Sequence, residues 1–168
     1  DRYDVQMNGT SDRELLVFVH STGTGPSLWA GVPDAAVGNR RKLCPANVGY
    51  SADDVLPRGV ASGPSDDAAR VLSAIPAESS VHLVAHSYGA LVALHAAKQL
   101  GARVASLFFF EPVVFGRLLD EPDVDSLARE QARSFHSHPW FLTDSDRGGR
   151  DEWLETFVDY WNRPGSWS

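Results

Sequence analysis

The segment that most constrains the fold is residues 81–91, Val-His-Leu-Val-Ala-His-Ser-Tyr-Gly-Ala-Leu. A short apolar run leads directly into Ser87, and a glycine follows two residues later where a helical pattern begins. This order predicts a strand that turns sharply into a helix, with the serine standing clear of the backbone at the turn. The second residue after the serine must be small so that the helix and the strand can approach each other, and Gly89 meets that requirement.

Three apolar runs predict the central strands of a sheet. Residues 15–19 are continuously apolar, and residues 81–85 and 104–110 are apolar apart from His82 and Ser106, which is typical of parallel strands that are covered on both faces. A weaker strand is expected over residues 42–46. We expect the strands to alternate with helices, which indicates an α/β fold with a mostly parallel sheet flanked by helices.

Helical patterns lie between these runs. Apolar residues recur with helical spacing from Ala68 to Ile75, with Ser65 as the expected N-cap and Pro76 as the stop. Residues 88–99 are apolar nearly all round and end at Gly101, which predicts a buried helix packed on the sheet.

The character of the chain changes after Gly116. Charged, amphipathic helical patterns occupy residues 123–135 and 151–161, with a polar loop over 136–150. We therefore assign residues 1–116 to the core and residues 117–168 to a helical cap or lid, which we expect to be incomplete. The alternative is that these helices form an ordinary outer layer of the same domain.

Composition narrows the possible partners. The net charge of −7 argues against nucleic acid and against an anionic membrane surface, both of which attract clustered Lys and Arg. No apolar run approaches the roughly 20 residues of a membrane helix. A single cysteine, Cys44, is compatible with a reducing compartment, so a cytoplasmic location is expected. We expect no metal and no cofactor.

The Ser87 turn and a second loop together indicate nucleophilic chemistry. After residues 15–19 the chain continues as His20-Ser21-Thr22-Gly23-Thr24-Gly25, and such a small-residue loop can direct a backbone N–H at a developing oxyanion. Phosphate binding or a plain turn are the alternatives for this loop. The amides of Thr22 and Tyr88 are the predicted oxyanion donors. The predicted substrate-binding side chains are His20, Ser21, Trp29 and His86. The alternative for His20 is a supporting role, in which it fixes the oxyanion loop without touching substrate.

Four segments carry a resemblance to a known family. They are His20-Ser21-Thr22-Gly23, Val48-Gly49-Tyr50-Ser51, Ala85-His86-Ser87-Tyr88-Gly89 and Phe109-Phe110-Glu111-Pro112-Val113. The chain resembles the N-terminal part of an α/β-hydrolase of the esterase, lipase and haloperoxidase-like kind. The resemblance implies hydrolysis of an ester-type bond in a small molecule, through an acyl-enzyme at Ser87.

The chain departs from the family pattern at three points. Ser21 and Ala85 stand where the family has glycine. The family's last two strands, with the usual acid and histidine, have no counterpart here. The sheet is therefore expected to expose one edge, through which self-association is possible.

The remaining residues offer few candidates for the acid and the base. Glu111, at the end of a predicted strand, is an alternative acid, while His136 and His138 fall in the expected cap loop. Three interpretations follow. The first is a serine hydrolase, the second a catalytically inactive truncated or pseudo-hydrolase that binds a small molecule, and the third a half that a second chain completes.

Overall fold

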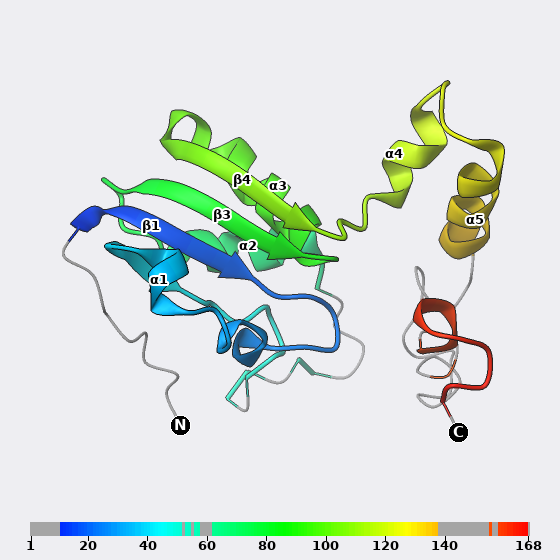
Figure 1. Cartoon of the computed structure of the whole chain (residues 1–168), viewed down its shortest axis with the longest axis horizontal. Coiled ribbons are helices and arrows are strands. Elements are labelled where there is room, and N and C mark those ends of the chain that lie inside the picture. The colour runs from blue at the N-terminus through cyan, green and yellow to red at the C-terminus, as the bar shows by residue number, and fades with distance from the viewer. Residues whose placement is uncertain are drawn as a thin grey trace. The chain divides into compact units, whose positions relative to one another are not determined.

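The computed structural model describes residues 11–51, 53–54, 56–57, 62–137, 155 and 158–167 (Figure 1). The chain divides into two compact units. The first comprises residues 1–57 and 62–114, and the second comprises residues 58–61 and 115–168. In the described part, no helix has the length and apolar character needed to cross a membrane.

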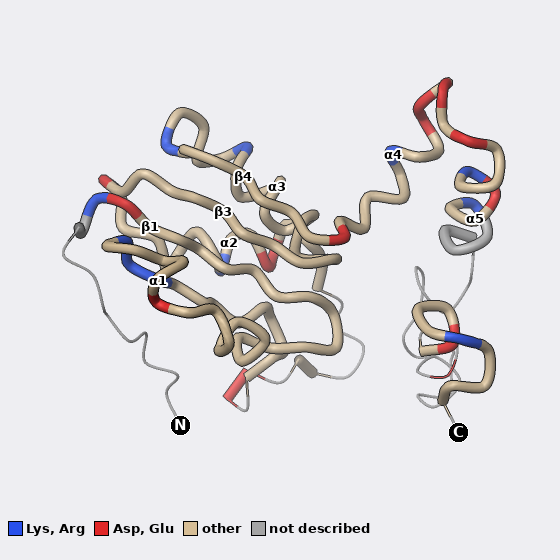
Figure 2. The backbone as a smooth tube through the Cα atoms, in the orientation of Figure 1, with Lys and Arg blue, Asp and Glu red and all other residues tan. Residues whose placement is uncertain are grey.

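The first unit is built on a sheet of four described strands, all of them parallel. They are arranged in the order β2-β1-β3-β4, with bounds β1 Ser11–Val19, β2 Arg40–Leu43, β3 Ser80–His86 and β4 Val104–Phe110. β3 and β4 carry no charged residue and are tan along their length in Figure 2. The predicted α/β class with a mostly parallel sheet is confirmed.

The expected strand at residues 42–46 is displaced. β2 begins two residues earlier, at Arg40, and ends at Leu43. As the outer strand beside β1 it is only half-buried, and the Arg40 guanidinium lies 3.2 Å from the Glu14 carboxylate. An edge strand can hold charged side chains, so an apolar run does not mark its start.

Two helices cover one face of the sheet. α2 (Pro64–Ser73) and α3 (Gly89–Leu100) pack against the side chains that alternate inward along β1 and β3. Figure 1 shows both helices on the same side of the sheet. The core is formed by buried aliphatic residues of these four elements, among them Leu15, Val17, Val19, Ala68, Val71, Val81, Leu83, Ala85, Val92, Ala93 and Ala96.

Two details of the predicted helices are wrong. α2 is capped at Gly63 and not at Ser65, because Pro64 already has the backbone φ of a first helical turn and the Asp66 carboxylate accepts the Gly63 N–H at 2.9 Å. α3 is buried along one face and not all round, since Leu94 is 38% exposed.

Short elements complete the first unit. They are η1 (Pro26–Trp29), α1 (Asp34–Val37) and η2 (Gly101–Arg103). β4 is the outer strand of the described sheet and exposes Phe108 and Phe110 by 62% and 56%. The expected exposed edge and self-association through it stay predictions.

The described part of the second unit consists of helices and turns. It contains α4 (Phe115–Asp120), α5 (Ser126–Ser137) and helical residues at 155 and 158–161. α5 overlaps the helix expected over 123–135, and most of the expected loop at 136–150 lies outside the described residues. The Asp159 carboxylate accepts the N–H groups of Gly165, Ser166 and Trp167 at 2.8, 2.9 and 3.3 Å. The role of this unit as a cap stays a prediction.

Gly89 marks the closest approach of α3 to β1. A Cβ atom at this position would lie 2.5 Å from the carbonyl oxygen of Val19 and 2.7 Å from that of His20. Carbon and oxygen cannot approach so closely without a backbone shift. The small residue expected two positions after Ser87 is therefore required by packing.

We predict that Gly89→Ala lowers the free energy of unfolding by about 3 kcal/mol, because the methyl group overpacks a backbone contact that has no flexible side chain to yield. Gly31→Ala is the matched control, since a Cβ at Gly31 meets nothing within 4 Å, and its effect should stay within about 0.5 kcal/mol. Urea denaturation measures both variants. Equal stabilities of the two would contradict the close approach.

Candidate active site

Ser87 lies in a strained turn between β3 and α3. Its φ is +52°, in the left-handed region that costs a residue with a Cβ about 1–2 kcal/mol. The turn is held by backbone hydrogen bonds: the Ser87 N–H donates to the Phe110 carbonyl at 3.0 Å, and the Ser87 carbonyl accepts the Ala90 N–H at 3.0 Å. In the described part of the chain no group is hydrogen bonded to the Ser87 hydroxyl.

The loop after β1 lies beside this turn. Val19 of β1 is in register with Ala85 of β3, so both chains leave the sheet at the same level. The Ser21 carbonyl accepts the N–H and the hydroxyl of Thr24 at 3.4 and 2.9 Å, which closes a tight turn around Thr22 and Gly23. Of the two predicted oxyanion donors, neither the Thr22 amide nor the Tyr88 amide has a hydrogen-bond partner among the described residues.

His20 is an internal support of this loop. Its side chain is fully buried, Nδ1–H donates to the Ser21 carbonyl at 2.9 Å, and Nε2 accepts the Asn47 N–H at 3.0 Å. Burial lowers the pKa of His20, and the hydrogen bond to Ser21 and the charge of Asp67 oppose that shift. Both ring nitrogens are occupied and the ring is fully buried, which favours the alternative that His20 supports the oxyanion loop over a contact with substrate. Ser21, 5% exposed, is buried in the same way.

Trp29 and His86 lie against aromatic rings. The Trp29 ring packs on Phe18, with centroids 5.2 Å apart, and the His86 ring packs on Phe110 at 5.4 Å. In the described structure, Nε1 of Trp29 and Nδ1 of His86 are buried without a hydrogen-bond partner. Their predicted contact with substrate stays a prediction.

Glu111 follows β4 directly and lies opposite the Ser87 turn. His86 is in register with Phe110, so the next residue on each strand is Ser87 and Glu111. Like Ser87, Glu111 has a Cβ and lies in the left-handed region, with φ +48°. Its carboxylate is largely exposed and lies 3.7 Å from Nε2 of His86. A carboxylate at the carboxyl end of a parallel strand is on the side where such sheets bind ligands.

In the described part of the first unit, no histidine side chain is hydrogen bonded to the Ser87 hydroxyl. His82 is hydrogen bonded to the Ser106 hydroxyl at 2.8 Å, and His95 is on the exposed side of α3. His136 belongs to α5 of the second unit, and His138 lies outside the described residues. The described residues also contain no group of three His, Cys, Asp or Glu side chains that could hold a metal ion.

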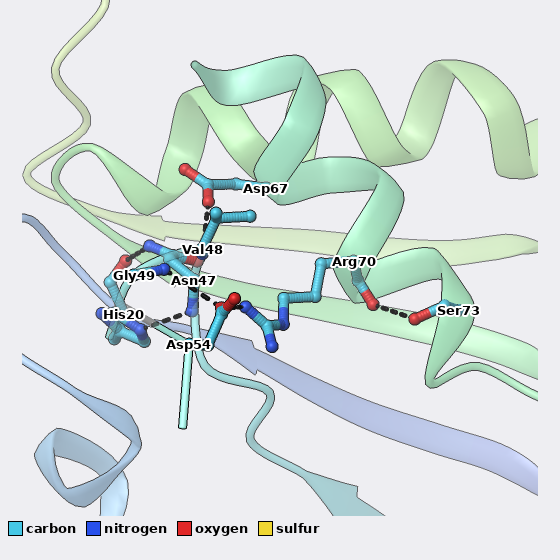
Figure 3. Close-up of polar contacts among 8 residues, drawn as sticks. All are labelled: His20, Asn47, Val48, Gly49, Asp54, Asp67, Arg70 and Ser73. Carbon is cyan, nitrogen blue, oxygen red and sulfur yellow. Dashed lines mark hydrogen bonds and ion pairs between the residues drawn. The ribbon is translucent and has the colours of Figure 1, made fainter. Parts of the chain in front are cut away.

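Asp67 is a site residue that sequence reasoning missed (Figure 3). It is 4% exposed, one carboxylate oxygen accepts the Val48 N–H at 2.7 Å, and the other accepts the Tyr88 hydroxyl at 2.7 Å. Burial and this hydrogen bond raise the pKa of the Tyr88 hydroxyl, which keeps it a donor. The helical spacing that predicts α2 already places Asp67 on the apolar face beside Ala68 and Val71. A carboxylate there requires partners.

Comparison with known protein families identifies the family of this chain. A model of the alpha/beta hydrolase family matches residues 16–167. The chain belongs to the alpha/beta hydrolase family. No curated protein sequence matches it.

Solved structures share the hydrolase fold at low identity. DBJA is 19% identical and is matched over 94% of this chain and 53% of its own, with a TM-score of 0.60. A putative ancestral haloalkane dehalogenase is 19% identical and is matched over 94% of this chain and 52% of its own, with a TM-score of 0.60. An extracellular alpha/beta-hydrolase from a Paenibacillus species is 17% identical and is matched over 73% of this chain and 49% of its own, with a TM-score of 0.52. The chain thus spans about half the length of these structures.

The buried imidazole of His20 predicts a pH dependence of stability. Because burial lowers the pKa of His20 below the ordinary 6.5, the unfolded chain binds more protons than the folded one as the pH falls below 6.5. Stability should therefore drop from that pH down to the lowered pKa and level off below it. The stabilisation by neutral His20 is fully present above 6.5.

We predict that the wild type loses more free energy of unfolding between about pH 7.5 and about pH 5.5 than His20→Gln does, because the amide cannot be protonated in this range. Urea denaturation at the two pH values measures the difference. Equal losses for both proteins would show that His20 does not stay neutral in the fold.

Proposed function

We propose that this chain carries the nucleophile and the oxyanion hole of a serine hydrolase that cleaves an ester-type bond in a small molecule. The single observation that carries the proposal is the left-handed backbone of Ser87 at the turn from β3 into α3. A side chain with a Cβ occupies such a conformation only where the surrounding structure imposes it, and these positions cluster at active sites. The hydrolase family and the two unpartnered amides support the same interpretation.

The proposed reaction is an acyl transfer. The Ser87 oxygen attacks the carbonyl carbon, its proton passes to a general base, and the oxyanion that forms accepts the N–H groups of Thr22 and Tyr88. When the intermediate collapses, the base returns the proton to the departing alcohol and an ester to Ser87 remains. Water, activated by the same base, then releases the acid and restores the hydroxyl.

The acid and the walls of the pocket belong to this proposal as well. Glu111 is the candidate acid that would orient the base, because it follows β4 at the position opposite Ser87. Trp29 and His86 are the candidate pocket residues. A cytoplasmic location and self-association through β4 complete the proposal.

A second function rests on a specific observation. No described histidine is hydrogen bonded to the Ser87 hydroxyl, so a fold that binds a small molecule without hydrolysing it is the rival. Covalent labelling separates the two functions. A serine activated by a base reacts quickly with an electrophile, whereas a serine without a base reacts slowly and binding alone leaves no adduct.

We predict that a fluorophosphonate probe labels the protein and that Ser87→Ala abolishes both the label and the turnover of a p-nitrophenyl ester. Ser73→Ala is the matched control: its hydroxyl is exposed on α2 and donates to the Arg70 carbonyl, so labelling should be unchanged. In-gel fluorescence and peptide mapping measure the adduct. Labelling that persists in Ser87→Ala would remove Ser87 from the mechanism, and a protein that takes no label would favour the binding function.

A further inference from the structure

Asp67 joins three segments of the first unit. It projects from α2, accepts the backbone N–H of Val48 with one oxygen and accepts the hydroxyl of Tyr88 with the other, both at 2.7 Å. A carboxylate that is only 4% exposed is costly to bury unless its oxygens are paired. The two contacts therefore have to form together, which fixes the loop after β2 and the residue after Ser87 relative to α2.

The loop after β2 is in turn bound to the loop after β1. The Asn47 N–H donates to Nε2 of His20 at 3.0 Å, and the Asn47 side-chain amide donates to the His20 carbonyl at 3.4 Å. The Gly23 N–H donates to the Tyr50 hydroxyl at 3.0 Å. Figure 3 shows His20, Asn47, Val48 and Asp67 in this arrangement. A continuous path of hydrogen bonds and short backbone links thus leads from Gly23 to Tyr88.

The loop after β2 has a second attachment to α2, through Asp54. The Asp54 carboxylate accepts the Gly49 N–H at 3.2 Å and is paired with the Arg70 guanidinium of α2. The loop after β2 is therefore attached to α2 at two places, through Asp67 and through Asp54. Because this loop cannot move independently of α2, the position of α2 also fixes the position of the loop after β1 that is bound to it.

The two ends of the path coincide with the two amides of the proposed oxyanion hole. Thr22 precedes Gly23 directly, and Tyr88 carries the second amide itself. Donors stabilise an oxyanion only when they are held at hydrogen-bond distance from the place where the charge develops. A displacement of about 1 Å from a change outside the reacting groups can reduce a rate about 100-fold.

We propose that Asp67 is a positioning residue of the oxyanion hole, which holds the Tyr88 amide in place through the Tyr88 hydroxyl and the Thr22 amide through the loop after β2. This inference rests on the proposed function for the role of the two amides. It assigns Asp67 no contact with substrate.

Tyr88→Phe tests the inference with the loss of one oxygen atom. The ring and the backbone amide remain, but Asp67 loses the donor of one of its two contacts. We expect the maximal rate of fluorophosphonate inactivation to fall about tenfold, while the inhibitor concentration for half-maximal rate stays within about twofold, because positioning acts on the transition state. Asp67→Asn should keep the rate within about threefold of wild type, since its amide group can accept from Val48 and donate to the Tyr88 oxygen.

Asp66→Asn is the control for a purely structural effect. Asp66 is the exposed neighbour in the first turn of α2, so this variant removes a negative charge that the helix N-terminus favours, without touching the path. Its melting temperature should fall while the inactivation rate stays that of wild type. If Asp66→Asn slows inactivation as much as Tyr88→Phe does, the effect of Tyr88→Phe is a loss of stability and the proposal is wrong.

Amide hydrogen exchange, followed by NMR on the same proteins, gives a readout that needs no activity. In Tyr88→Phe the amides of Gly23 and Asn47, at the far end of the path, should exchange faster, whereas the amide of Ala93 inside α3 should not change. An unchanged inactivation rate or unchanged exchange at Gly23 would each overturn the proposal. If the wild type takes no label at Ser87, the proposed function fails, and exchange alone decides whether Asp67 holds the two loops together.

Discussion

The close contact between α3 and the end of β1 is the constraint on which the site depends. Gly89 allows it, because any Cβ would enter the backbone of Val19 and His20. Once the helix lies this close, the chain between β3 and α3 has to turn within Ser87 and Tyr88, which forces Ser87 to a positive φ. The strain of about 1–2 kcal/mol is smaller than the gain from burying residues such as Val92 and Leu100, at about 1.5–3 kcal/mol for a fully buried aliphatic side chain. Packing therefore determines the turn, and the turn presents the hydroxyl.

A second, polar layer then fixes the loops that the apolar core does not reach. His20, Asn47 and Asp67 are buried among strands and helices, and their hydrogen bonds cross between the loops after β1 and β2 and the start of α3. Each such bond contributes only about 1 kcal/mol net, but leaving a buried partner unsatisfied costs about 1–3 kcal/mol. Breaking the network therefore costs more free energy than forming it contributes to stability. The network selects one arrangement of these loops, as expected of groups that define a site.

Local sequence patterns predict much of this structure. The apolar runs at 81–85 and 104–110, and the serine and glycine that follow the first of them, predicted β3, β4 and the turn at Ser87 because each signal lies within a few residues. The start of β2 and the N-cap at Gly63 were predicted wrongly, since an edge strand tolerates charge and Pro64 outweighs Ser65. The role proposed for Asp67 depends on Val48 and Tyr88, 19 and 21 residues away, and the contacts of His20 depend on Asn47, 27 residues away. No local pattern identifies these partners.

The central claim is that the loop after β1 and the turn at Ser87 together form one oxyanion hole. The most direct measurement is a crystal structure of the protein after reaction with a phosphonate electrophile, in which a phosphonyl oxygen occupies the position of the oxyanion. The account predicts an adduct on Ser87 with that oxygen about 2.7–3.1 Å from the amide nitrogens of both Thr22 and Tyr88. An adduct whose phosphonyl oxygen points away from these two amides, or an adduct on another residue, would contradict it.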